Sequence, residues 1–142
     1  MALETLLKAY MHPSAGSQDD LFDQDRPLGS LSAKIAICRR LGLIDQDVEH
    51  ALHMIRRIRN DFAHSFGDET LSHEKQQQRL AEATAVFRKS AGWAKLGQSI
   101  VGADKSAPVA EFARLLIVAV SRIEIHARLQ SRSAPRTTIT AV

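Results

Sequence analysis

Apolar side chains recur every three or four residues between Asp45 and Gly67, and this periodicity constrains the fold more than any other feature. The apolar positions are Val48, Leu52, Ile55, Ile58 or Arg59, Phe62 and Phe66. This spacing places one apolar side on a helix of about six turns. Asp45 suits the N-cap of that helix, and Gly67 suits its end. Because one side is apolar throughout, other helices must cover it.

Further segments with helical spacing supply that cover. They are residues 2–11, 30–41, 72–91 and 107–129. Ser30 or Ser32 caps the second segment, and Gly42 ends it, so a tight turn joins it to the long helix as an antiparallel hairpin. No segment shows a convincing strand pattern. The sequence therefore predicts an all-α, single-domain bundle of about five helices.

Each predicted helix has an expected core side. In residues 30–41, we expect the side chains facing the core to be Leu31, Ile35, Cys38 and Leu41. Those expected on the opposite side are Lys34, Arg39 and Arg40. The helix over 107–129 has an apolar side so broad that we expect it to be buried or to sit at an interface. The loop over 12–29 carries four aspartates, and we expect it to be solvated, with Leu21 and Phe22 tucked onto the body.

Length and composition place the chain among small globular proteins. Its 142 residues are 44% hydrophobic and carry a net charge of +3, so a packed core is expected. We expect a helical domain over residues 1–130 and a disordered basic tail over 131–142. The single cysteine, Cys38, allows no internal disulfide, and the N-terminus shows no secretion signal, which together favour the cytoplasm. The longest apolar run, 115–120, is too short for a membrane span.

The end of the long helix carries a polar constellation: Arg59, Asn60 and His64. Histidine moves protons near neutral pH, and arginine presents a planar fork of donors to phosphate oxygens. Asn60 and His64 are four apart and share a face, whereas Arg59 and His64 diverge by about 140°. We therefore predict a catalytic site that needs a second copy of the chain. A structural or dimer-forming role, and binding of a nucleotide or partner in the same groove, stay open.

The segment RNDFAH, residues 59–64, resembles the Arg-x4–6-His signature of the HEPN superfamily, whose members are small, all-helical and often dimeric. The resemblance implies metal-independent RNA cleavage, in which the substrate's own 2′-hydroxyl attacks the adjacent phosphate. His64 would carry the proton, Arg59 would hold the phosphate and Asn60 would orient either group. Two copies of the motif would face each other across a homodimer.

A broader resemblance covers about residues 2–66. A Pro-Leu-Gly-x-Leu box at 27–31, a basic helix and a Leu-Gly-Leu-Ile turn at 41–44 occur in the order found in the mannitol operon repressor (MtlR) family. The family's first helix is usually longer, and ALETLLKAY resembles only its second half. The resemblance implies an intracellular bacterial helical protein named as a transcriptional regulator. It supplies no DNA-reading element.

The charged surface gives weaker indications about partners. After the turn at 42–45, the first exposed side chains include Asp47 and Glu49, which DNA phosphates would repel, so direct DNA reading is not favoured. The predicted basic patch for RNA or an acidic partner consists of Arg39, Arg40, Arg56 and Arg57. A solvated charged face is the alternative. His50 and His53 lack an obvious third ligand for a metal.

We therefore expect a cytoplasmic regulatory protein of the MtlR type that acts through protein contacts and forms a homodimer. The alternative is a HEPN-type ribonuclease that uses Arg59, Asn60 and His64, and whether the chain is an enzyme stays open. No cofactor, metal or membrane is expected. RNA and a regulatory protein are the partners under consideration.

Overall fold

The computed structural model describes residues 2–11, 13–14, 16, 19–65, 70–90, 92–94 and 107–130. Within these ranges the regular structure is helical, without strands, and the helices pack on one another. This confirms the predicted all-α bundle. The predicted tail over 131–142, the end of the predicted long helix at 66–67 and most of the connection over 92–107 lie outside the described residues.

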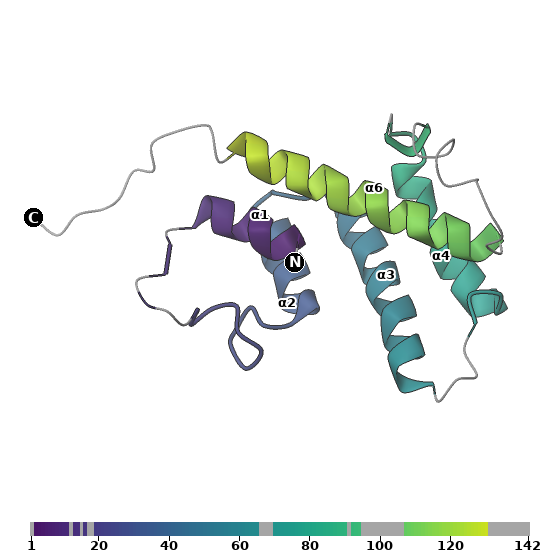
Figure 1. Cartoon of the computed structure of the whole chain (residues 1–142), viewed down its shortest axis with the longest axis horizontal. Coiled ribbons are helices and arrows are strands. Elements are labelled where there is room, and N and C mark those ends of the chain that lie inside the picture. Colours follow the sequence, from purple (N-terminus) through teal and green to yellow (C-terminus); the bar gives the residue numbers. More distant parts are fainter. Residues whose placement is uncertain are drawn as a thin grey trace, which may run out of the picture.

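Four of the longer helices pack on one another, and the fifth, α6, crosses them. Their bounds are α1 Ala2–Tyr10, α2 Leu31–Arg40, α3 Gln46–His64, α4 Glu74–Phe87 and α6 Ala107–Gln130. The helices α2 and α3 form the predicted antiparallel hairpin, and α4 packs against α3 as its second neighbour. The long helix α6 lies across the bundle and contacts α4 near one end and α1 near the other (Figure 1). Among the described helices, none combines the length and the apolar character that a membrane crossing requires.

The helix caps follow the sequence signals. The backbone N–H of Ala33 donates to Ser30 Oγ at 3.0 Å, so Ser30 is the N-cap of α2. The backbone N–H of Val48 donates to Asp45 Oδ1 at 2.8 Å, as predicted for the N-cap of α3. Between the two helices, Gly42 has φ +69°, a left-handed conformation that glycine adopts without steric cost. These three residues fix the length and direction of the hairpin.

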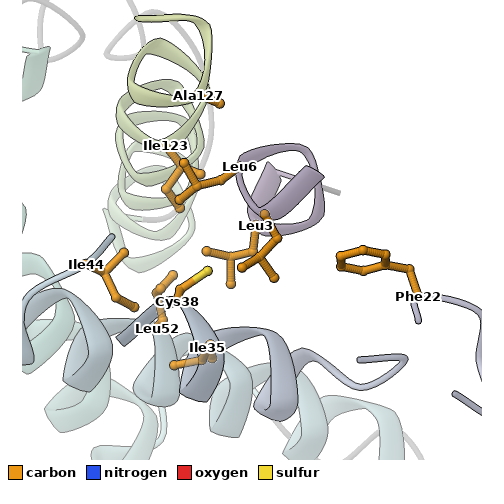
Figure 2. Packing of buried hydrophobic residues seen from close by; sticks show 10 residues of the cluster. Leu3, Leu6, Phe22, Ile35, Cys38, Ile44, Leu52, Ile123 and Ala127 are labelled. Atoms are coloured by element: carbon orange, nitrogen blue, oxygen red, sulfur yellow. The ribbon is translucent and has the colours of Figure 1, made fainter. Parts of the chain in front are cut away.

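The first half of the core lies where α1 meets α2, the start of α3 and the end of α6 (Figure 2). Its buried members are Leu3, Leu6, Leu7, Phe22, Ile35, Cys38, Ile44, Leu52, Ile123 and Ala127. The short helix α1 would be marginal alone because it has nine residues. Its three buried leucines dock it, which explains how so short a helix is held.

The second half of the core lies between α3, α4 and the first half of α6. Its buried members are Ala51, Met54, Ile58, Leu80, Ala83, Phe87, Trp93, Leu115, Val118 and Ala119. Val48 and Ile55 of α3 pack against both halves. The helix α3 is therefore the shared wall of the core, as its long apolar periodicity requires.

Three side chains in or next to the predicted helices differ from the expected orientation. Lys34, expected outside, is 4% exposed because α1 packs over that side of α2. Leu41, expected inside, is 50% exposed because it follows the last residue of α2 at the turn. Phe62, also expected inside, is 39% exposed. It lies near the end of α3, which extends away from α6 and beyond the packed centre of the bundle (Figure 1).

Candidate functional site

The three predicted site residues lie in the last two turns of α3. Arg59 and His64 are exposed, and Asn60 is half-buried. Asn60 and His64 share one face of the helix, while Arg59 lies about 140° around the axis from His64. In a single chain, Asn60 therefore adjoins Arg59 in the sequence and shares a face with His64. Arg59 and His64 themselves are not brought together.

A groove of about 500 Å³ lies beside Arg59, where α3 passes the start of α2. Its lining residues are Gln24, Gly29, Ser30, Leu31, Ser32, Arg56, Arg59 and Asn60. His64 is not among them. The groove thus joins two of the predicted catalytic residues to Arg56 and to the N-terminal turn of α2. The sequence did not indicate this contact with residues 24–32, because it depends on how the hairpin packs.

Asp61 fixes the rotation of α3 at this end. Its Oδ2 accepts hydrogen bonds from Lys75 Nζ at 2.7 Å, Arg79 Nη1 at 2.8 Å and Gln76 Nε2 at 3.0 Å, all from α4. Lys75, followed by Arg79, lowers the pKa of this carboxyl from 3.8 to about 2. Since Asp61 is held toward α4, the adjacent Asn60 is turned toward α2 and the groove.

The residues of the predicted basic patch lie in two separate places. They are Arg39, Arg40, Arg56 and Arg57. Arg39 Nε contacts Glu49 Oε2 at 3.5 Å, near the start of α3, and Arg40 is exposed beside it in sequence. Arg56 lies seven residues beyond Glu49, which is about 10 Å along the helix axis. Arg56 lines the groove, whereas Arg57 is exposed and does not line it. Only Arg56 of this set therefore belongs with Arg59.

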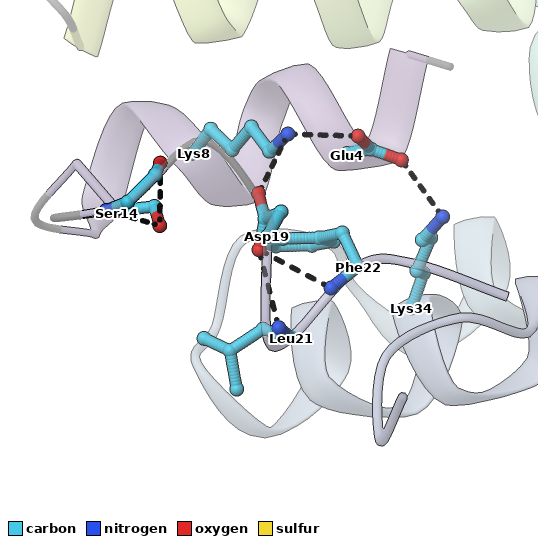
Figure 3. A network of polar contacts seen from close by, with 8 residues as sticks. Glu4, Lys8, Ser14, Asp19, Leu21, Phe22 and Lys34 are labelled. Carbon is cyan, nitrogen blue, oxygen red and sulfur yellow. Dashed lines mark hydrogen bonds and ion pairs between the residues drawn. The ribbon is translucent and has the colours of Figure 1, made fainter. Parts of the chain in front are cut away.

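A second polar cluster, which the sequence did not reveal, ties α1 to α2 and to the loop before α2 (Figure 3). Lys34 Nζ donates to Glu4 Oε2 at 2.8 Å, and Lys8 Nζ bridges Glu4 at 2.9 Å and Asp19 at 2.9 Å. Phe22 lies beneath both ammonium groups, with its ring centre 5.0 Å from Lys8 Nζ and 5.7 Å from Lys34 Nζ. The four-residue spacing of Glu4 and Lys8 was the only local signal for it.

Two of the loop aspartates form ion pairs, and only Asp19 does so within this cluster. Besides bridging Lys8, Asp19 accepts hydrogen bonds from the backbone N–H groups of Leu21 and Phe22 at 3.1 Å and 3.3 Å. Asp20 lies 3.4 Å from Arg26. Phe22 is buried as expected, whereas Leu21 is 43% exposed rather than tucked in. The loop is therefore held on the body just before the groove-lining residues begin.

Metal ligands do not gather in the part of the chain that the structure describes: no three His, Cys, Asp or Glu side chains form such a group there. His50 instead contacts Glu82 of α4 at 3.2 Å. Burial, followed by the positive charge of Arg56, lowers the pKa of His53. These histidines therefore belong to the sides of α3 rather than to a shared site.

Comparison of the chain with protein-family models, with curated proteins and with solved structures finds no match.

Proposed function

We propose that this chain is a regulatory protein that acts through contacts with other proteins, as its resemblance to the MtlR family implies, and that it works as a homodimer. The observation that carries the proposal is an apolar ridge along α6. Its positions are four residues apart, and all but Ser121 are apolar: Val109, Ala113, Ile117, Ser121, Ile125 and Leu129. We call this set the α6 ridge. A row with this spacing is the kind that packs into a groove of another helix.

The exposure of the α6 ridge supports its role in contacts. Val109 and Ile117 are 40% and 42% exposed, and Ile125 and Leu129 reach 57% and 60%. Val120, beside the ridge, is 41% exposed. Apolar side chains gathered along one helix in this way mark interaction surfaces more often than scattered ones do.

A hollow of about 470 Å³ lies beside the ridge between α4 and α6. Val86, Val118, Ser121 and Ile125 are among its lining residues, together with the cationic Lys89 and Arg122. A ridge next to a hollow is the shape that two identical surfaces need, because each copy offers both parts to the other across a two-fold axis. This shape supports a second copy of the chain as a binding partner.

The test begins with the oligomeric state of the full chain. We expect light scattering to give a dimer at micromolar concentration and Ile117→Glu/Ile125→Glu to give a folded monomer. Leu41→Glu is the matched control, since Leu41 is equally exposed but lies at the end of α2. A parent protein that is strictly monomeric, or a dimer that survives both ridge substitutions, contradicts the proposed dimer.

The regulatory role needs a test in cells that express the chain. We expect the ridge variant to reproduce the transcript changes of a deletion strain, and Arg59→Ala/His64→Ala to leave transcripts like those of the parent. In the opposite pattern, the ridge variant leaves transcript levels like those of the parent and the Arg59/His64 variant changes them as deletion does. That result contradicts regulation through the α6 ridge.

A HEPN-type ribonuclease is the second candidate, favoured by the exposure of Arg59 and His64 on the projecting end of α3. The α6 ridge does not flank this end, so a composite site needs a different dimer seam. Exposed Phe62, which lies between Arg59 and His64 in the sequence, is an apolar side chain that could contribute to it. Incubation with single-stranded RNA and EDTA tests it. Cyclic-phosphate products that disappear with His64→Ala support it, and their absence, or equal cleavage by the variant, contradicts it.

A further inference from the structure

The groove beside Arg59 has the chemistry of an oxyanion site, independently of both the α6 ridge and His64. Its eight lining residues include two arginines, an asparagine, a glutamine and two serines, and no carboxylate. Asp23 and Asp25 flank Gln24 in the sequence but do not line the groove. The groove is therefore rich in donors and carries the positive charge of Arg56 and Arg59.

Arg56 gives the strongest sign that a ligand belongs there. Its Nε is buried and has no hydrogen-bond partner among the described residues. Buried polar groups in folded proteins are nearly always paired, and the side chain of Arg56 lines the groove, so an acceptor bound there would pair its guanidinium. Phosphate and related oxyanions are the acceptors that the planar fork of arginine fits best.

The start of α2 adds donors to the same groove. Ser30, Leu31 and Ser32 all line it, and the first turn of α2 contains no acidic residue. Ser30 Oγ accepts the N–H of Ala33, which leaves the hydroxyl hydrogen of Ser30 free to donate. The N–H groups of Leu31 and Ser32 precede the first hydrogen bonds within the helix, so they too are donors for an anion.

We infer that the groove formed by Arg56, Arg59, Asn60 and the N-terminal turn of α2 binds a phosphate group. Arg56 and Arg59 would hold two of its oxygens, and the Leu31 and Ser32 N–H groups would hold a third. A volume of about 500 Å³ has room for more than a bare phosphate. The group therefore belongs to a small phosphomonoester or to the backbone of a nucleic acid.

The test is a titration of the full, ¹⁵N-labelled chain with inorganic phosphate at constant ionic strength. We expect saturable shifts of the Leu31 and Ser32 amides and of the Arg56 Nε–H. Arg56→Gln should raise the dissociation constant by about tenfold. Arg57→Gln is the matched control: it removes the same charge from the neighbouring position outside the groove and should change the constant less than twofold.

If Arg56→Gln does not fold, Arg59→Gln replaces it, because Arg59 is exposed and its loss leaves the core intact. Equal losses from Arg57→Gln and from the groove variants would show diffuse charge attraction and overturn the site. Absence of saturable shifts at Leu31 and Ser32 would also overturn it. Ribose 5-phosphate and a short single-stranded RNA are titrated in parallel. The one with the lower dissociation constant shows whether the phosphate comes from a small phosphomonoester or from a nucleic acid.

Failure of this inference is distinguishable from failure of the functions proposed above. Ile117→Glu/Ile125→Glu should abolish the dimer and leave phosphate binding unchanged. His64→Ala should remove any RNA cleavage and leave phosphate binding unchanged, since His64 does not line the groove.

Discussion

Arg79 of α4 donates a hydrogen bond of 2.8 Å to Asp61 of α3, one residue after Asn60 and three before His64. Lys75 and Gln76 bind the same carboxylate oxygen. The polar end of α3 is thus anchored on its α4 side by one carboxylate. By helix geometry, Arg59 and Asn60 lie about 160° and about 100° around the axis from Asp61, so both turn away from α4. His64, three residues beyond Asp61, lies on the Asp61 side of the helix and is exposed.

Replacing Asp61 by Asn should lower the free energy of unfolding by about 1 kcal/mol at neutral pH, because charge-assisted hydrogen bonds to a partly exposed carboxylate are lost. Chemical denaturation measures the change. Glu82→Gln, which removes the exposed contact with His50 between the same two helices, should cost less than about 0.5 kcal/mol. Equal effects of the two substitutions would contradict an anchoring role for Asp61.

Asp61 should also produce acid-dependent stability. Its pKa is lowered from 3.8 to about 2 in the folded chain, chiefly by Lys75. A lowered pKa means that the stabilisation is fully present above pH 3.8 and is lost as pH falls toward about 2. We expect the stability difference between the parent and Asp61→Asn to shrink over this interval. A difference that stays constant down to pH 2 would contradict the shift.

The pair of Lys34 and Glu4 should matter more than a surface ion pair, because Lys34 is almost fully buried. Glu4→Gln leaves that ammonium without its carboxylate and should destabilise the chain by about 2 kcal/mol. Lys34→Met should cost less, since the remaining Glu4 keeps Lys8 as a partner. Thermal or urea unfolding of both variants checks the order, and a larger loss for Lys34→Met would contradict it.

Cys38 should resist thiol reagents in the folded protein. It is fully buried, and burial raises the pKa of its thiol to about 11. We expect labelling by a disulfide reagent at pH 8 to proceed only as fast as the chain opens, and denaturant to accelerate it strongly. Rapid stoichiometric labelling of the native protein would show that the first half of the core is open.

Gly29 should be intolerant of a side chain. A Cβ at this position would lie 2.4 Å from the backbone oxygens of Asp23 and Gln24, so the loop must shift. Gly29→Ala should cost about 1–3 kcal/mol by overpacking and should weaken phosphate binding in the groove as well. Gly92→Ala is the control, since nothing lies within 4 Å of its added Cβ. A neutral Gly29→Ala would mean that the loop adapts freely.

Much of the fold could be predicted because the signals are local. The apolar periodicity placed the helices, and Ser30, Gly42 and Asp45 marked their ends through caps and a positive φ that depend on near neighbours in the chain. Side chains whose environment depends on distant segments were assigned less well. Lys34 was expected outside because the approach of α1, which carries Glu4, cannot be read from the periodicity of α2.

The candidate site divides in the same way. Arg59, Asn60 and His64 were identified from spacing on one helix, and their divergence around the axis followed from helix geometry. Helix geometry could not predict which residues surround these three side chains. The groove exists because the N-terminal turn of α2 passes Arg56 and Arg59, which depends on the register of two packed helices.

The sequence by itself determined the helical class, the hairpin of α2 and α3, and which polar residues lie at the end of α3, because these depend on interactions within a few residues. Only the tertiary structure decided which of them share a groove, that Lys34 is buried and that Val109, Ile117, Ile125 and Leu129 of α6 are exposed. Those outcomes depend on how helices far apart in the chain pack, and that packing is set by the whole core at once.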